Sequence, residues 1–82
     1  MVRVALDSSF KKNFSKIKDA SLKDKIIKQI EKLKENPDAG KPMKFVRKGT
    51  RELYVKPFRL SYLYLKEEDK VLILDLYHKN EQ

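Results

Sequence analysis

The chain has 82 residues, which is enough for one small domain, and it contains no cysteine, which excludes disulfides and thiolate metal sites. Its single histidine has no ligand spacing around it, so we expect neither a metal nor a cofactor. Twenty basic residues against twelve acidic ones give a net charge of +8, which predicts attraction to nucleic acid or to an acidic protein, although a plain solubility surface is also consistent with it. No apolar run approaches the roughly 18 residues of a membrane span, and no signal peptide follows Met1, so we expect a cytoplasmic protein without membrane contact.

The first expected element is a short strand. Apolar and other residues alternate over residues 2–6, which predicts that Val2, Val4 and Leu6 face the core. The next three residues are all good helix caps: Asp7, Ser8 and Ser9.

Two helices are expected next. The spacing of Phe10, Phe14 and Ile17 predicts a helix that runs to about Lys18. A capping box over residues 21–24, with Ser21 and Asp24 as its partners, predicts the start of a second helix. This helix ends at Asn36 because Pro37 disfavours helical geometry in the residue before it. A short polar turn between the two predicts a helical hairpin.

Residues 37–50 form a loop that is rich in proline, glycine and basic residues. We expect one short extended piece within it, from Met43 to Val46. Its basic side chains suit a phosphate backbone, but an exposed, soluble loop explains them as well. Those side chains are Lys41, Lys44, Arg47 and Lys48.

The last part of the chain predicts three strands. Residues 51–65 are rich in β-branched and aromatic residues, and Pro57 interrupts them, which indicates two strands joined by a tight turn. A charged turn over residues 66–70 leads to residues 71–77, which are apolar on both faces apart from Asp75 and are typical of a central strand. The order β-α-α-β-β-β predicts a small two-layer α+β domain, with the helical hairpin packed on one face of a mainly antiparallel sheet.

The open face of this sheet carries the candidate site. Alternation in residues 58–65 places Phe58, Leu60, Tyr62 and Tyr64 on one side and Arg59 on the other. If the last two strands pair, Arg59 lies near the end of the chain. The neighbours expected around it are basic or aromatic, and they suit a single strand of nucleic acid. They are Tyr54, Lys56, Tyr77, Lys79 and, along the rim, Lys44, Arg47, Lys48 and Arg51.

Simpler interpretations of the same residues stay open. Arg59 can pair with Asp75 across the hairpin, and Tyr54 and Tyr77 can be packing residues of the sheet surface. His78 can be a residue at the end of a strand with no special role.

Ribonuclease chemistry fits these residue types, because RNA carries its own nucleophile, the 2′-hydroxyl. The reaction needs a proton acceptor, a cation beside the phosphate and a proton donor to the leaving oxygen. The unperturbed pKa of His78, near 6.5, suits either proton role, and the guanidinium of Arg59 suits the phosphate.

The sequence as a whole resembles the RelE/ParE toxin superfamily. The resemblance rests on an ordered set of short motifs along nearly the whole chain: Asn36-Pro37, Gly40 to Lys44, Arg51 to Val55, Phe58 to Tyr62 and Leu76 to Lys79. It implies the toxin of a toxin–antitoxin pair, whose partner would be an antitoxin with an acidic or helical segment.

The resemblance also implies two alternative activities. RelE-type members cleave messenger RNA in the ribosomal decoding site by 2′-hydroxyl attack, without metal, which inhibits translation, whereas ParE-type members poison DNA gyrase. By position, Arg59 matches the strand arginine of the family, Lys79 the basic residue after the last strand, and His78 the histidine of many relatives. We expect the ribonuclease, with Arg59, Lys79, His78 and Tyr77 as catalytic residues. Tyr54 departs from the family, in which many members have a basic residue there, and a C-terminal tyrosine of some RelE-type members has no counterpart here. A degenerate toxin that binds RNA or antitoxin without cleavage is therefore a further alternative.

Overall fold

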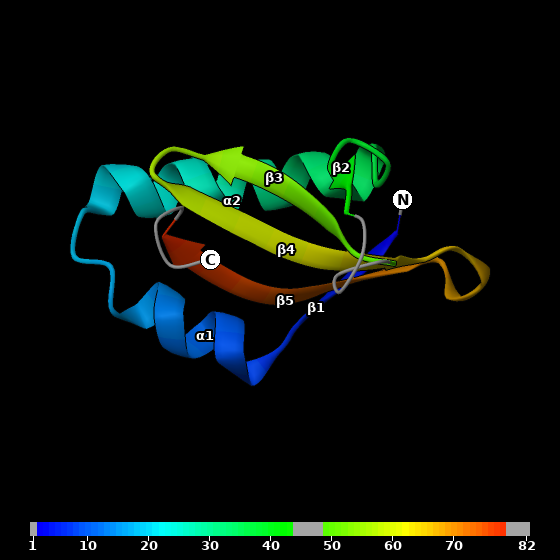
Figure 1. The fold of residues 1–82 in the computed structure, drawn as a ribbon, viewed down its shortest axis with the longest axis horizontal. Coiled ribbons are helices and arrows are strands. Elements are labelled where there is room, and N and C mark those ends of the chain that lie inside the picture. The colour runs from blue at the N-terminus through cyan, green and yellow to red at the C-terminus, as the bar shows by residue number, and fades with distance from the viewer. Residues whose placement is uncertain (1, 44–48, 79–82) are drawn as a thin grey trace.

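The computed structural model describes residues 2–43 and 49–78. The elements follow the expected order, with one additional two-residue strand before the last three (Figure 1). They are β1 (Arg3–Leu6), α1 (Ser8–Ser15), α2 (Ala20–Glu35), β2 (Lys41–Pro42), β3 (Arg51–Val55), β4 (Phe58–Leu65), the short helical turn η2 (Lys66–Glu68) and β5 (Lys70–His78).

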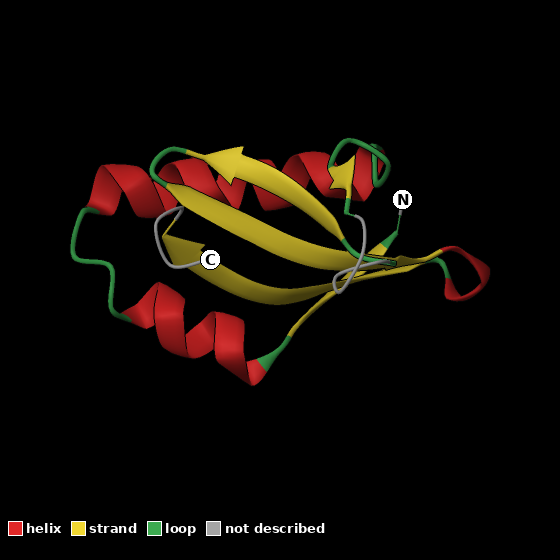
Figure 2. Ribbon diagram, viewed as in Figure 1, coloured by secondary structure: helices red, strands yellow, loops and turns green. Residues whose placement is uncertain are grey.

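The strands form one five-stranded sheet in the order β1-β5-β4-β3-β2 (Figure 2). The pairs from β2 to β5 are antiparallel, and β1 pairs with β5 in parallel. Helix α2 lies behind β3 and β4 in Figure 1, and α1 lies alongside β5. The expected α+β domain, with two helices packed against a mainly antiparallel sheet, is therefore confirmed.

The core lies between the sheet and the helices. The predicted inward side of β4 is confirmed, because Leu60 and Tyr62 are fully buried and Phe58 and Tyr64 pack against the same cluster. On β5 the alternation shifts by one residue at a bulge, since Ser61 pairs with Asp75 and Tyr62 pairs with Ile73. Further core side chains come from both helices, from the connection between them and from β5: Phe10, Ile17, Ile26, Leu33, Val71, Ile73 and Leu76.

Three local expectations were wrong. Leu6 is 40% exposed, because β1 is an edge strand and Leu6 stands at its end. The capping box at Ser21 does not form. Asp19 is the cap of α2, and its carboxylate accepts hydrogen bonds from the N–H groups of Ser21 and Leu22. The first helix ends at Ser15, before Lys18, whereas Asp7 caps it as expected.

The loop after α2 also differs from expectation in its register. The extended piece begins at Lys41, and the Met43 N–H continues the pairing by donating to the Thr50 carbonyl at 2.9 Å. Residues 44–46 of the expected piece lie outside the described residues.

Candidate active site

Arg59 belongs to β4, which lies between β3 and β5 in the sheet. Its partner on β3 is Tyr54, and its partner on β5 is Tyr77. Because directly paired residues of a sheet project to the same face, the three side chains lie side by side. The structure therefore brings together three of the residues that the sequence predicted for the site.

A buried carboxylate joins this row. Glu52 precedes Tyr54 by two residues on β3, which places it on the same face. Its side chain is only 5% exposed, and Oε1 lies 3.4 Å from Nη1 of Arg59. The Tyr77 hydroxyl donates a hydrogen bond to Oε2 of the same carboxylate. A buried charge needs such partners, so Glu52, Arg59 and Tyr77 form one coupled polar cluster.

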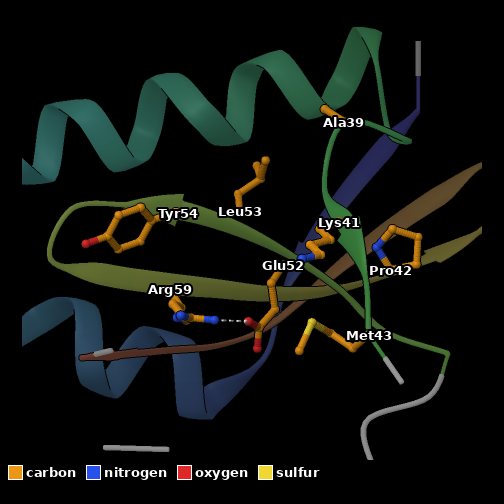
Figure 3. Close-up of a pocket in the computed structure, with 8 residues that line it drawn as sticks. All are labelled: Ala39, Lys41, Pro42, Met43, Glu52, Leu53, Tyr54 and Arg59. Atoms are coloured by element: carbon orange, nitrogen blue, oxygen red, sulfur yellow. Dashed lines mark hydrogen bonds and ion pairs between the residues drawn. The ribbon is translucent and has the colours of Figure 1, made fainter. Parts of the chain in front are cut away.

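A groove opens beside the cluster (Figure 3). Because β2 pairs with β3 only at Arg51 and Glu52, the rest of this edge of β3 is left open by β2. The resulting groove has a volume of about 680 Å³. Polar and apolar side chains line it together: Ala39, Lys41, Pro42, Met43, Glu52, Leu53, Tyr54 and Arg59.

The wall made by β2 is held from inside the core. The buried Tyr62 hydroxyl donates to the Pro37 carbonyl and accepts from the Gly40 N–H, both at 2.8 Å. Burial raises the pKa of this hydroxyl, and the Gly40 N–H opposes the shift in part. Arg51 adds a second brace, because its guanidinium donates to the carbonyls of Asp38 and Gly40. The structure thus places Arg51 against the loop that ends in β2.

His78 has a different position from the other predicted catalytic residues. It pairs with Phe58 on β4, and the two rings meet edge to face with centroids 5.7 Å apart. Strand alternation puts His78 on the face opposite to Tyr77, and Phe58 on that opposite face packs against the core. The structure does not place the His78 side chain beside Arg59.

The remaining predicted residues divide into two groups. Lys56 is exposed in the turn between β3 and β4, which contains a cis peptide bond before Pro57. The others, Lys44, Arg47, Lys48 and Lys79, lie outside the described residues.

The alternative pairing of Arg59 with Asp75 is not the one observed. Arg59 pairs with Glu52, and Asp75 accepts hydrogen bonds from the Asn13 side chain and the Leu76 N–H, both at 2.8 Å. Sequence reasoning did not assign Glu52 to the site. The available signal was the position of Glu52, two residues before Tyr54. Strand alternation puts both residues on the same outward side of β3, the strand that pairs with the Arg59 strand.

Two general properties complete the description. Within residues 2–43 and 49–78, no group of three or more His, Cys, Asp or Glu side chains is placed to hold a metal ion. Neither of the described helices has an apolar stretch that is long enough to cross a membrane.

Solved structures with a similar fold include toxins of toxin–antitoxin systems. The structure of the intact E. coli RelBE toxin–antitoxin complex matches over 100% of both chains with a TM-score of 0.81 and 15% identity. The toxin–antitoxin complex RelBE2 of Mycobacterium tuberculosis matches with a TM-score of 0.84 and 21% identity, over 95% of this chain and 98% of the other. A conserved hypothetical protein of Helicobacter pylori is 28% identical, with a TM-score of 0.70 over 99% of this chain and 98% of the other. The fold is therefore that of the RelE/ParE toxins.

The family assignment follows from the sequence match. The model of the ParE toxin of the type II toxin–antitoxin system parDE matches residues 4–82, so the chain belongs to this family and is a toxin of a type II toxin–antitoxin system. A comparison with curated proteins gave no match.

Proposed function

We propose that this toxin is an endoribonuclease that cleaves RNA by attack of a 2′-hydroxyl on the neighbouring phosphate. The observation that carries the proposal is the buried Glu52 carboxylate, which contacts both Arg59 and the Tyr77 hydroxyl at the side of an open groove. A proton acceptor, a cation and a hydroxyl donor thus lie within one cluster, and these are the three groups that the reaction needs.

The first step is the attack of the 2′-oxygen. Glu52 takes the proton of the 2′-hydroxyl, and the 2′-oxygen forms a bond to phosphorus. Negative charge then builds on the phosphoryl oxygens. The Arg59 guanidinium, whose side chain is 37% exposed, stabilises this charge through hydrogen bonds to two of the oxygens.

The second step is the departure of the 5′-oxygen. The bond between phosphorus and the 5′-oxygen breaks, and Tyr77 supplies the proton that this oxygen takes up. Tyr77 recovers a proton from Glu52 through the hydrogen bond that joins them. The products are a 2′,3′-cyclic phosphate and a free 5′-hydroxyl, and the enzyme returns to its starting state. The scheme assigns no step to a metal ion or to His78.

The substrate we propose is messenger RNA on the ribosome, and the protein partner we propose is a cognate antitoxin. The net charge of +8 supports both, because it attracts a polyanionic RNA and an acidic segment of an antitoxin. The E. coli and M. tuberculosis relatives were solved as toxin–antitoxin complexes, which supports the same kind of partner here.

The second candidate function is inhibition of DNA gyrase. The observation that favours it is the family description, which names the ParE toxin. In this alternative, the toxin binds a protein target, and the Glu52 cluster has a structural role.

Primer extension on messenger RNA from induced cells separates the two candidates. The wild type should give new 5′ ends within translated regions, and Arg59→Ala should give none. The matched control is Arg3→Ala, which removes an exposed arginine on β1. Growth arrest with intact messages and cleaved chromosomal DNA would favour the gyrase function instead, and the absence of both effects would indicate a degenerate toxin.

A further inference from the structure

We propose that the groove side of Tyr54 is a stacking site for one unpaired nucleobase of the RNA, next to the phosphate that Arg59 binds. This inference rests on the proposed ribonuclease function and specifies how its substrate is held. It implies that the enzyme requires unpaired RNA at the cleavage site, because a base in a duplex cannot reach the groove.

The exposure of Tyr54 is the first observation. Its relative exposure is 53%, whereas Tyr62 is fully buried and Tyr77 is 9% exposed. An exposed aromatic ring at the side of a groove offers a flat face, and nucleobases stack on such faces irrespective of their sequence. In Figure 3 the Tyr54 ring lies over the end of β3, and Arg59 is near it on β4.

The relation of Tyr54 to Arg59 is the second observation. The two residues are direct partners across β3 and β4, so their Cβ atoms are about 5 Å apart. A base on Tyr54 and a phosphate on Arg59 are therefore at a separation that one nucleotide can bridge. The same pair thus holds both parts of a single nucleotide.

The shape and lining of the groove are the third observation. Its volume of about 680 Å³ is within the range of small-molecule sites. Pro42, Met43 and Leu53 line it together with Tyr54. This apolar lining suits the faces of a base better than it suits a sugar-phosphate backbone. The Tyr62 and Arg51 hydrogen bonds to residues 37–40 hold the β2 wall in place, so the site is formed before RNA binds.

The backbone of β3 adds polar groups to the site. The Met43 N–H donates a hydrogen bond to the Thr50 carbonyl across the ladder. The alternation of an antiparallel ladder then directs the N–H and C=O of Glu52, and next those of Tyr54, toward the β2 side. The strand β2 pairs with Glu52 and does not extend to Tyr54. The Tyr54 amide thus presents one donor and one acceptor at the groove, which can pair with the edge of a base.

The test is equilibrium binding of a short single-stranded RNA in which 2′-O-methyl groups block cleavage. Tyr54→Ala should weaken binding by about tenfold or more, as expected for the loss of one stacked base, and Tyr54→Phe should stay within about twofold of the wild type. The matched control is Ile27→Ala, which removes a 45%-exposed side chain on α2 that is outside the lining of the groove.

Abasic oligonucleotides make the test specific for a base. A set of RNAs, each with one abasic nucleotide, should contain one position at which the wild type loses as much affinity as Tyr54→Ala loses with intact RNA. At that position Tyr54→Ala should cause no further loss. Additive losses at every position would overturn the proposal, because the ring would then not contact a base.

The outcomes separate this inference from the ribonuclease function. If Arg59→Ala weakens RNA binding and Tyr54→Ala does not, the stacking site is wrong, whereas the ribonuclease function is not contradicted and is decided by the primer extension. If the wild type binds no RNA, free or on ribosomes, both are wrong. Melting temperatures of the same samples show whether Tyr54→Ala is less stable than Ile27→Ala. If it is, Tyr54→Phe, which keeps the ring, is the variant whose RNA affinity is compared with that of the wild type.

Discussion

The Gly40 N–H donates a hydrogen bond to the Tyr62 hydroxyl at 2.8 Å, and this contact leaves no room for a side chain at position 40. A Cβ atom there would lie 2.5 Å from the hydroxyl oxygen and 2.6 Å from a ring carbon. Both neighbours belong to a fully buried ring, so neither can move away easily. The close approach of the Gly40 backbone to the core thus explains why the motif from Gly40 to Lys44 begins with a glycine.

Gly40→Ala should therefore destabilise the fold by about 1–3 kcal/mol, the usual cost of overpacking. Urea denaturation of the purified protein measures the change. Ala39→Ser is the control, since residue 39 is exposed and next in sequence. Equal stability of Gly40→Ala and wild type would mean that the loop does not lie against Tyr62.

The buried hydroxyl of Tyr62 predicts a loss of stability in alkali. Burial raises its pKa above the ordinary value of 10.0, so above pH 10 the unfolded chain releases this proton before the folded chain does. The unfolded state then binds fewer protons, and the free energy of unfolding falls as pH rises toward the folded pKa. Denaturation series from pH 8 to pH 11 should show a smaller decline for Tyr62→Phe than for the wild type. Tyr54→Phe, at an exposed tyrosine, should keep the decline of the wild type.

The hydrogen bond between Asn13 and Asp75 ties α1 to β5. A double-mutant cycle of Asn13→Ala and Asp75→Ala should give a coupling of about 1 kcal/mol in the free energy of unfolding. Asp75→Ala alone should cost more than Asn13→Ala, because Asp75 also accepts from the Leu76 N–H. Zero coupling would show that the helix is held to the strand by apolar contacts alone.

The geometry of the Arg59 guanidinium should matter beyond its charge. Arg59→Lys keeps a cation beside Glu52 and should leave stability within about 1 kcal/mol of the wild type, but it loses the two-pronged contact with the phosphate. We expect RNA cleavage to fall by about 100- to 1,000-fold, as for the loss of one transition-state donor. Arg3→Lys serves as the control. Full cleavage activity in Arg59→Lys would indicate that this residue contributes only its positive charge and not a two-pronged contact with the phosphate.

Much of the fold was predictable because local signals agreed with one another. Pro57 between two strand-forming runs predicts the β3–β4 hairpin, and the apolar run after residue 70 predicts the central strand β5. The cap of α2 was not predictable in the same way. Asp19 and Ser21 are both good caps two residues apart, and only the structure shows which one meets the free N–H groups.

The site was predictable in part. Strand alternation and hairpin pairing were sufficient to place Tyr54, Arg59 and Tyr77 on one face. The same alternation puts His78 on the other face. His78 was chosen for the chemistry of its imidazole, and strand geometry was the better guide to its position. The position of Glu52 beside Arg59 follows from the register of β3 on β4, and the groove follows from the short length of β2. Neither of these can be obtained from residue types alone.

Glu52→Gln tests the central claim most directly, because the amide keeps the size of the side chain but does not accept the 2′-hydroxyl proton. The measurement is cleavage of messenger RNA in a purified translation reaction, with the new 3′ ends analysed for 2′,3′-cyclic phosphate. We predict cyclic phosphate ends with the wild type and with the control Glu31→Gln, which changes an exposed glutamate of α2. In Glu52→Gln the rate of cleavage should fall by at least about 100-fold. Cleavage by Glu52→Gln at the rate of the wild type would contradict the account, since Glu52 would then not be the proton acceptor of the reaction.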